Sequence, residues 1–100
     1  LVSGTTATHG TDRAICEGDP RGQTVYALDK IAAALESFGG SLADVMRTRL
    51  WLADADDWEA VSRVHGRMLA EALPANTLIE TGRLVGPYRV EIEAEAVLDD

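Results

Sequence analysis

Three glutamates spaced two residues apart, Glu91, Glu93 and Glu95, form a regular acidic row that could do chemistry. Alternate residues of a β-strand lie on one face of the sheet, roughly 6.8 Å apart. Three carboxylates in such a row could bind a hard cation or supply a general base. We favour the simpler interpretation of a solvated strand face, because the ligands of a metal site normally converge from several elements.

His65 is the next candidate, because it falls among the apolar positions of an expected helix and precedes Gly66. A histidine in such a stripe is usually packed and hydrogen-bonded, but it is also a side chain that can transfer protons near neutral pH. Both roles stay open from the sequence. His9 lies in a polar turn, where we expect it to be exposed.

Two further patterns have structural interpretations. The acidic segment 54–57 resembles the start of a calcium-binding loop, but the residues that follow it do not supply the central glycine and the glutamate at the twelfth position of such a loop. We therefore expect a turn that caps a helix, with negative charge favoured at the helix N-terminus. Cys16, the single cysteine, is expected to be a small packed residue rather than a nucleophile. No metal site is expected.

The elements that would position these groups follow from periodicity and turn signals. Residues 1–7 are expected to form a strand interrupted by a glycine, followed by a polar turn and a return strand at 14–17. A helix is predicted to begin with Asp19 as N-cap and Pro20 in its first turn, and to end at the glycine pair 39–40. Its apolar face is predicted to contain Val25, Leu28, Ile31, Ala32, Leu35 and Phe38.

In the second half of the chain, the spacing of apolar residues alternates between a period of two, typical of strands, and a period of three to four, typical of helices. Residues 41–44 have the form of a capping box that begins one short turn. The following strand is predicted to have an apolar face formed by Met46, Thr48, Leu50 and Leu52, and another face formed by Arg47, Arg49 and Trp51. Asp56 or Asp57 is expected to cap a helix whose buried stripe contains Trp58, Val61, Val64, His65, Met68 and Leu69. Strands at 76–85 and 88–98, separated by a Gly-Pro turn, complete the chain.

These elements follow the order β-β-α-β-α-β-β. A strand–helix–strand unit favours parallel pairing, and the hairpins expected at the two ends of the chain favour antiparallel pairing. We therefore expect an α+β sandwich in which two helices pack on one face of a mixed β-sheet. A chain of 100 residues has nothing left to cover the other face, so another subunit is expected to cover it.

Composition and charge exclude several classes of function. Nine basic and seventeen acidic residues give a net charge of −8, which argues against nucleic-acid binding and against binding to an anionic membrane. The sequence has no apolar run close to the roughly 20 residues of a membrane span, no signal stretch and no glycine-rich phosphate loop. We expect a single soluble, cytoplasmic domain covering residues 1–100.

Taken in order, several short motifs resemble the Rid family, the YjgF-like reactive intermediate deaminases that are also labelled L-PSP endoribonuclease-like. Each motif is weak alone, but the ordered set covers essentially residues 1–98. The matching segments are Val2-Ser3-Gly4, Gly18-Asp19-Pro20 with Gln23, Ala27-Leu28-Asp29-Lys30-Ile31, Gly40-Ser41-Leu42-Ala43-Asp44-Val45, Leu52-Ala53-Asp54 with Asp57-Trp58, Pro74-Ala75-Asn76 and Val90-Glu91-Ile92-Glu93-Ala94.

The resemblance implies a chorismate-mutase-like α+β fold that assembles as a homotrimer and binds a small-molecule ligand in clefts between subunits. It also implies hydrolysis of enamine and imine intermediates with release of ammonia, without metal or organic cofactor. By position, Glu91 matches the family glutamate that positions the attacking water. Ser3 and Gly4 match the Ser-Gly pair of the family cleft.

The chain departs from the family pattern at two places. The family's Pro-Ala-Arg motif, whose arginine holds the substrate carboxylate through two parallel hydrogen bonds, ends in Asn76 here. Loss of a charge-assisted hydrogen bond worth roughly 1.5–3 kcal/mol predicts a carboxylate affinity lower by about one to two decades. The tyrosine-bearing segment that precedes the first strand in the family is expected to be missing from this chain.

Two functions from different classes follow from these observations. The chain is either a Rid-like hydrolase with altered substrate recognition or a trimer that holds a small metabolite without turnover. In the first case Asn76 would bind a neutral amide or carbonyl compound and His65 would act as acid or base, while activity on 2-iminopropionate would be weak or absent. Ribonuclease activity is disfavoured, because the acidic chain offers no basic track for a nucleic-acid backbone.

Overall fold

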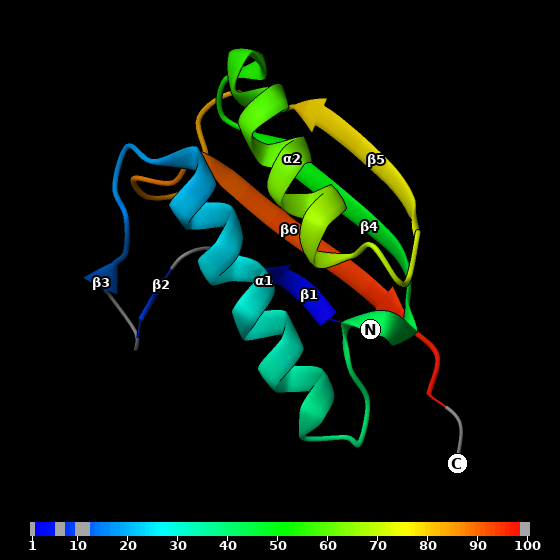
Figure 1. Cartoon of the computed structure of the whole chain (residues 1–100). Helices are drawn as coiled ribbons and strands as arrows, with labels where there is room; N and C mark the ends of the chain where they lie inside the picture. Colours follow the sequence, from blue (N-terminus) through cyan, green and yellow to red (C-terminus); the bar gives the residue numbers. More distant parts are fainter. Residues whose placement is uncertain (1, 6–7, 10–12, 99–100) are drawn as a thin grey trace.

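The computed structural model describes residues 2–5, 8–9 and 13–98, in which a layer of two helices covers one face of a sheet (Figure 1). The main sheet has four strands in the order β1-β6-β4-β5, and β2 and β3 form a separate small hairpin. The predicted α+β architecture is therefore confirmed. The elements are β1 (Val2–Thr5), β2 (Thr8–His9), β3 (Arg13–Ala14), α1 (Pro20–Glu36), η1 (Leu42–Asp44), β4 (Val45–Leu52), η2 (Ala55–Asp57), α2 (Trp58–Met68), β5 (Ala75–Glu80) and β6 (Val90–Ala96).

The sheet is mixed because β6 lies between β1 and β4 and runs antiparallel to both, whereas β4 and β5 are parallel. The parallel pair is joined through α2, as a strand–helix–strand unit requires. The hairpin expected from the last two strands is not formed, because β6 pairs with β4 and β1 and leaves β5 at the edge. This order suits the two strands: Val90, Ile92 and Ala94 of β6 are at most 2% exposed, whereas β5 has no fully buried residue.

Helix α1 begins at Pro20, whose fixed φ suits the first helical turn. Asp19 is the N-cap residue as predicted, although its side chain makes no capping hydrogen bond. Two predicted core positions are wrong: Val25 and Phe38 are 39% and 79% exposed. Val25 lies at the flank of the buried arc, and Phe38 follows the end of the helix at Glu36. The apolar residues of α1 that are buried are Ala27, Leu28, Ile31 and Leu35.

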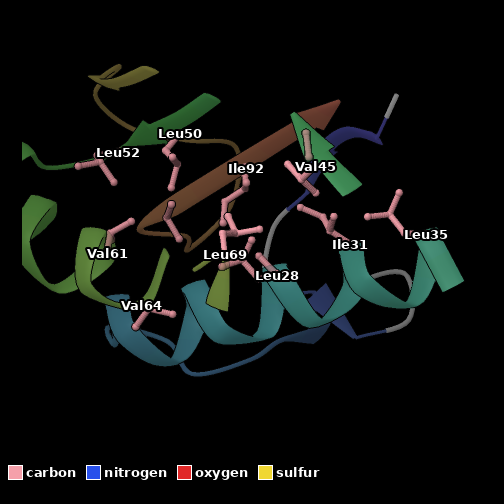
Figure 2. Packing of buried hydrophobic residues seen from close by; sticks show 13 residues of the cluster. Leu28, Ile31, Leu35, Val45, Leu50, Leu52, Val61, Val64, Leu69 and Ile92 are labelled. Atoms are coloured by element: carbon pink, nitrogen blue, oxygen red, sulfur yellow. The ribbon is translucent and has the colours of Figure 1, made fainter. Parts of the chain in front are cut away.

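The core lies between the two helices and the side of the sheet that faces them (Figure 2). Leu28 and Ile31 of α1 and Val61 of α2 meet Leu50 of β4 and Ile92 of β6, and all five are completely buried. Burial of each such side chain contributes roughly 1.5–3 kcal/mol. This packing fixes α2 over the sheet, and it therefore also fixes any polar side chain that the two layers direct toward each other.

The buried face of β4 differs from the prediction at its first residues. The pairing register with β6 shifts between Val45 and Arg47, so that consecutive residues do not simply alternate between faces. As a result Val45 is buried, and Met46, predicted for the apolar face, is 59% exposed. Trp58 was also expected in the buried stripe of α2, but it is the first residue of that helix and is 56% exposed.

Several strands are shorter than predicted. The strand expected at 76–85 ends at Glu80, and the strand expected at 88–98 spans only β6, so that residues 81–89 form a loop. The return strand expected at 14–17 ends with β3 at Ala14. Cys16 follows in left-handed backbone at φ +53° and is exposed rather than packed. Within the described residues, no helix has the length and apolar character needed to cross a membrane.

Candidate functional site

A chain of hydrogen bonds joins three elements on the helix-facing side of the sheet. Thr48 of β4 is 1% exposed, and its Oγ1 lies 2.8 Å from Nε2 of His65 on α2. The same hydroxyl donates to Oδ1 of Asn76 on β5, also at 2.8 Å. Two residues predicted for the site, His65 and Asn76, are therefore brought together, and Thr48 connects them.

The position of each member of this network follows from its element. Thr48 is the only polar residue on the buried face of β4, where Val45, Leu50 and Leu52 are its apolar companions. The parallel register of β4 and β5 places Thr48 directly beside Asn76. His65 lies on the buried side of α2 together with Val61 and Val64. Because α2 packs over the sheet, the three polar side chains meet.

The network runs from the interior to the surface. His65 is 9% exposed, and burial lowers its pKa from the ordinary value of 6.5, because the charged ring would lose its hydration. The ring is therefore neutral at neutral pH. Asn76 lies at the other end of the network and is exposed on the edge strand β5. A solvent-accessible amide is thus held by a buried hydroxyl and a buried neutral ring.

Glu91 lies on the other side of the sheet. In β6, Val90 and Ile92 face the core, and the half-buried Glu91 faces away from it, in register with Trp51 of β4. A single chain therefore holds Asn76 and Glu91 on opposite faces of the sheet. Among the residues that the structure describes, Glu91 forms no ion pair.

Ser3 and Gly4 lie in β1, at the edge of the sheet opposite to β5. Because β1 pairs with β6, their backbone lies beside the strand that carries Glu91. They are consequently separated from Asn76 by the width of the sheet. The side chains of Ser3 and His9 lie outside what the structure describes.

We call the side of the sheet that points away from the helices the far face; its residues on β4, β5 and β6 are Arg47, Arg49, Trp51, Ala75, Thr77, Ile79, Glu91, Glu93 and Glu95. Arg49 forms an ion pair with Glu93 at 3.3 Å. Arg47 faces Glu95 in the pairing register without forming an ion pair. The row of glutamates on β6 thus lies beside a row of arginines on β4. Within the described ranges, no cluster of side chains that could bind a metal ion is found.

Arg89 is also held by a carboxylate. Its Nε and Nη2 donate to the two carboxylate oxygens of Asp57 at 2.8 and 2.9 Å, and this hydrogen-bonded pairing raises the pKa of Arg89. Residues 54–57 form the predicted turn before α2, in which the Asp54 side chain accepts from the backbone N–H of Asp56 at 2.9 Å. Arg49 and Arg89 are thus both paired with carboxylates of the same chain.

Two buried polar residues that support this region, Thr48 and Gln23, were not predicted as site residues, although Thr48 was predicted on the apolar face of its strand and Gln23 belongs to a matching motif. Gln23 is completely buried; it accepts from the backbone N–H of Arg89 at 2.6 Å and donates to the carbonyls of Pro87 at 3.3 Å and Ile15 at 3.4 Å. It therefore fixes the end of the loop that precedes β6. A polar residue on an otherwise apolar face was the available signal for Thr48, because such a residue needs a partner.

Comparison with known proteins identifies relatives over nearly the whole chain. A family model described as Endoribonuclease L-PSP matches residues 1–98. A RutC family protein of Pyrococcus horikoshii is 37% identical over 82 residues, which cover 82% of this chain and 65% of that protein. This chain therefore spans slightly less than two thirds of the length of that relative.

Solved structures show the same fold. Rv2704 of Mycobacterium tuberculosis, described as a member of the YjgF/YER057c/UK114 family, is similar with a TM-score of 0.83 at 35% identity, covering 96% of this chain and 75% of its own. The YjgF gene product of E. coli gives a TM-score of 0.84 at 27% identity, covering 95% and 76%. The sequence and fold similarities therefore agree.

Proposed function

This chain belongs to the endoribonuclease L-PSP family, and from that membership we propose that it assembles as a homotrimer that hydrolyses the C=N bond of small enamine- or imine-type metabolites. The observation that carries the proposal is the separation of Glu91 and Asn76 on opposite faces of one sheet. Both residues occupy positions that the resemblance assigns to one ligand cleft. A site containing both therefore needs residues from two subunits.

The far face supports an intersubunit cleft. It carries Trp51 and Ile79, which is 46% exposed, among paired and unpaired charges. An uncovered sheet face with apolar side chains is stabilised when a second subunit removes it from water. Covering the far face would bring Glu91 of one subunit to the boundary with the next.

The proposed reaction needs a positioned water and no cofactor. Water adds to the imine carbon, and the C–O bond forms as Glu91 accepts a hydrogen bond from the attacking water and takes up a proton. The C=N π bond opens as the C–O bond forms, and that proton passes to the nitrogen to give a carbinolamine. The carbinolamine hydroxyl then loses its proton to Glu91, which returns it to the nitrogen, and the C–N bond breaks as the C=O bond forms, so that the products are a carbonyl compound and ammonia. A carboxylate without an ion-pair partner suits this role, because its lone pairs are free to accept from water.

Asn76 would bind the substrate in place of the family arginine, and Ser3 and Gly4 on β1 would complete the cleft beside β6. A neutral amide gives hydrogen bonds without charge, so the cleft would favour carbonyl or amide compounds over carboxylic acids. His65 reaches Asn76 only through the Thr48 hydroxyl. Its contribution therefore passes through Thr48.

A second candidate is a trimer that binds a small metabolite without turnover. The burial of His65 favours it, because a ring that is 9% exposed offers little surface for direct contact with a ligand as an acid or base. Ribonuclease action, although it appears in the description of the family model, suits neither the net charge of −8 nor the electrostatics of backbone binding.

The test is release of ammonia from imines generated in situ, with a set of neutral carbonyl-derived imines as substrates. We expect Glu91→Gln to lower the rate by about two orders of magnitude or more, which is the usual contribution of a positioned general base. Glu95→Gln is the matched control, because Glu95 lies on the same strand and face and should leave the rate unchanged. Substrate binding without ammonia release would select the second candidate, and equal loss in both variants would contradict the role of Glu91.

A further inference from the structure

The placement of the Asn76 amide oxygen, together with proton counting, sets the direction of the hydrogen bonds in the Thr48–His65–Asn76 network. A threonine hydroxyl has one proton to donate and lone pairs to accept with. In the structure that proton goes to Oδ1 of Asn76 at 2.8 Å. The contact of the same oxygen with Nε2 of His65, at 2.8 Å, must then be one in which the hydroxyl accepts. His65 therefore carries its proton on Nε2.

Burial strengthens this arrangement. Thr48 is 1% exposed, so that bulk solvent does not reach its hydroxyl to replace a lost partner. No buried side-chain nitrogen or oxygen among the described residues lacks a hydrogen-bond partner. Reversing only one of the two hydrogen bonds would place two donors or two acceptors against each other. Both groups would then be buried without a hydrogen bond, and the free energy of their desolvation would not be recovered. The two hydrogen bonds of the network can therefore reverse their direction only together.

The consequence appears at the exposed end of the network. Because Oδ1 of Asn76 is directed at the buried Thr48 hydroxyl, the amide nitrogen is the part of the side chain that is directed away from the network. That nitrogen has two N–H donors and accepts nothing. Rotation of the amide alone by half a turn is opposed, because it would bring an N–H group against the hydroxyl proton of Thr48.

We propose that His65 and Thr48 are positioning residues that hold the Asn76 amide with its NH2 group toward the ligand, so that the cleft selects a ligand group with an acceptor oxygen, such as a neutral keto or ester carbonyl. The choice of ligand rests on the proposed function, whereas the orientation of the amide does not. His65 acts here through Thr48 and transfers no proton to the ligand.

The first experiment tests the orientation without any ligand. Long-range proton–nitrogen correlation spectra of histidine-labelled protein distinguish the two neutral tautomers. Only two histidines are present, and His65→Gln assigns the signals. We expect His65 as the Nε2–H form at neutral pH. The Nδ1–H form would overturn the proposal, because Nε2 would then accept from Thr48 and the amide oxygen of Asn76 would face outward.

The second experiment tests the ligand class with methyl pyruvate, a neutral keto ester without donors, titrated into the full chain. We expect Thr48→Val to weaken binding about five- to tenfold, as for loss of one neutral hydrogen bond. Thr48→Ser, which keeps the hydroxyl, should bind as the unmodified protein does. Likewise His65→Gln, whose side-chain nitrogen can still donate, should bind better than His65→Leu.

A double-mutant cycle distinguishes an effect of Thr48→Val on the orientation of the Asn76 amide from a general loss of packing. In the Asn76→Ala background there is no amide to orient, so Thr48→Val should have no further effect on methyl pyruvate binding. An equal loss in both backgrounds would overturn the positioning role. Absence of methyl pyruvate binding together with the Nε2–H tautomer would remove the proposed ligand class and leave the amide orientation standing.

Discussion

At position 76 the chain has an amide where the resemblance to the Rid family implies a guanidinium. The amide is joined to Thr48 and through it to His65, so an arginine at this position would leave the Thr48 hydroxyl without its acceptor. The neutral side chain and its buried partners therefore form one unit. A change of substrate preference by a single substitution would come with a modest loss of stability, about 1 kcal/mol for the hydrogen bond.

We predict that the unmodified chain hydrolyses 2-iminopropionate weakly or not at all and that Asn76→Arg increases this activity. The gain should be about one to two orders of magnitude, because a charge-assisted hydrogen bond to the carboxylate is worth roughly 1.5–3 kcal/mol. The measurement is ammonia release from the imine generated in situ. Asn76→Gln, which is neutral, should show no such gain.

Rapid hydrolysis of 2-iminopropionate by the unmodified chain would contradict this argument. Another cation would then have to hold the substrate carboxylate. Because Arg49 and Arg89 are paired with Glu93 and Asp57, Arg47 on the far face would be the candidate, and Arg47→Gln would remove the activity.

At the scale of elements, the Arg89–Asp57 pair connects the start of α2 to the residue before β6. Both carboxylate oxygens of Asp57 are used, and the Asp57 side chain is 11% exposed while that of Arg89 is 36% exposed. The backbone N–H of Arg89 is also bound by the buried Gln23 of α1. Arg89, at the end of the loop before β6, thus connects α1 and the start of α2 to the sheet and fixes the position of the first residue of β6.

We predict that Arg89→Ala lowers the free energy of unfolding by about 1–2 kcal/mol, because it leaves the nearly buried Asp57 carboxylate without its partner. The matched control is Arg63→Ala, which removes an exposed ion pair with Glu59 within α2 and should cost no more than about 0.5 kcal/mol. Urea denaturation at one protein concentration measures both. Equal losses would show that the pairing with Asp57 adds nothing.

At the scale of the whole molecule, one face of the sheet is covered by both helices and the far face is not (Figure 1). The far face combines half-buried Trp51 and exposed Ile79 with rows of arginine and glutamate on neighbouring strands. Such a face suits contact with a copy of the same chain, because charges of both signs can find partners there. The proposed trimer accounts for the far face and for the separation of Asn76 from Glu91 together.

We predict that light scattering at micromolar concentration gives about three times the 10.7 kDa mass of the chain. Trp51→Glu should shift the protein toward monomer, because it places a carboxylate beside Glu91 and removes an apolar contact worth about 2 kcal/mol per subunit. Phe38→Glu, at an exposed site after α1, should leave the mass unchanged. A monomeric mass for the unmodified chain would contradict the trimer and, with it, a shared cleft.

The sequence alone predicted the features that depend on neighbouring residues. The start of α1 at Pro20, the capping box between Ser41 and Asp44, and the alternation of β6 were all confirmed, because capping and periodicity act within a few positions. Asn76 and Glu91 were identified from the resemblance, and His65 from its place in an apolar stripe. The link from His65 to Asn76 through the Thr48 hydroxyl was not predicted.

The tertiary structure alone decided which strands are neighbours and which side chains meet. Strand pairing depends on segments that are far apart in the chain. Local sequence signals therefore did not predict that β6 lies between β1 and β4 rather than beside β5. The pairing registers place Asn76 and Glu91 on opposite faces, and packing of α2 over β4 brings His65 to Thr48. A polar residue on an apolar strand face indicates that a partner is needed, but only the packing of the helix layer on the sheet determines which partner it is.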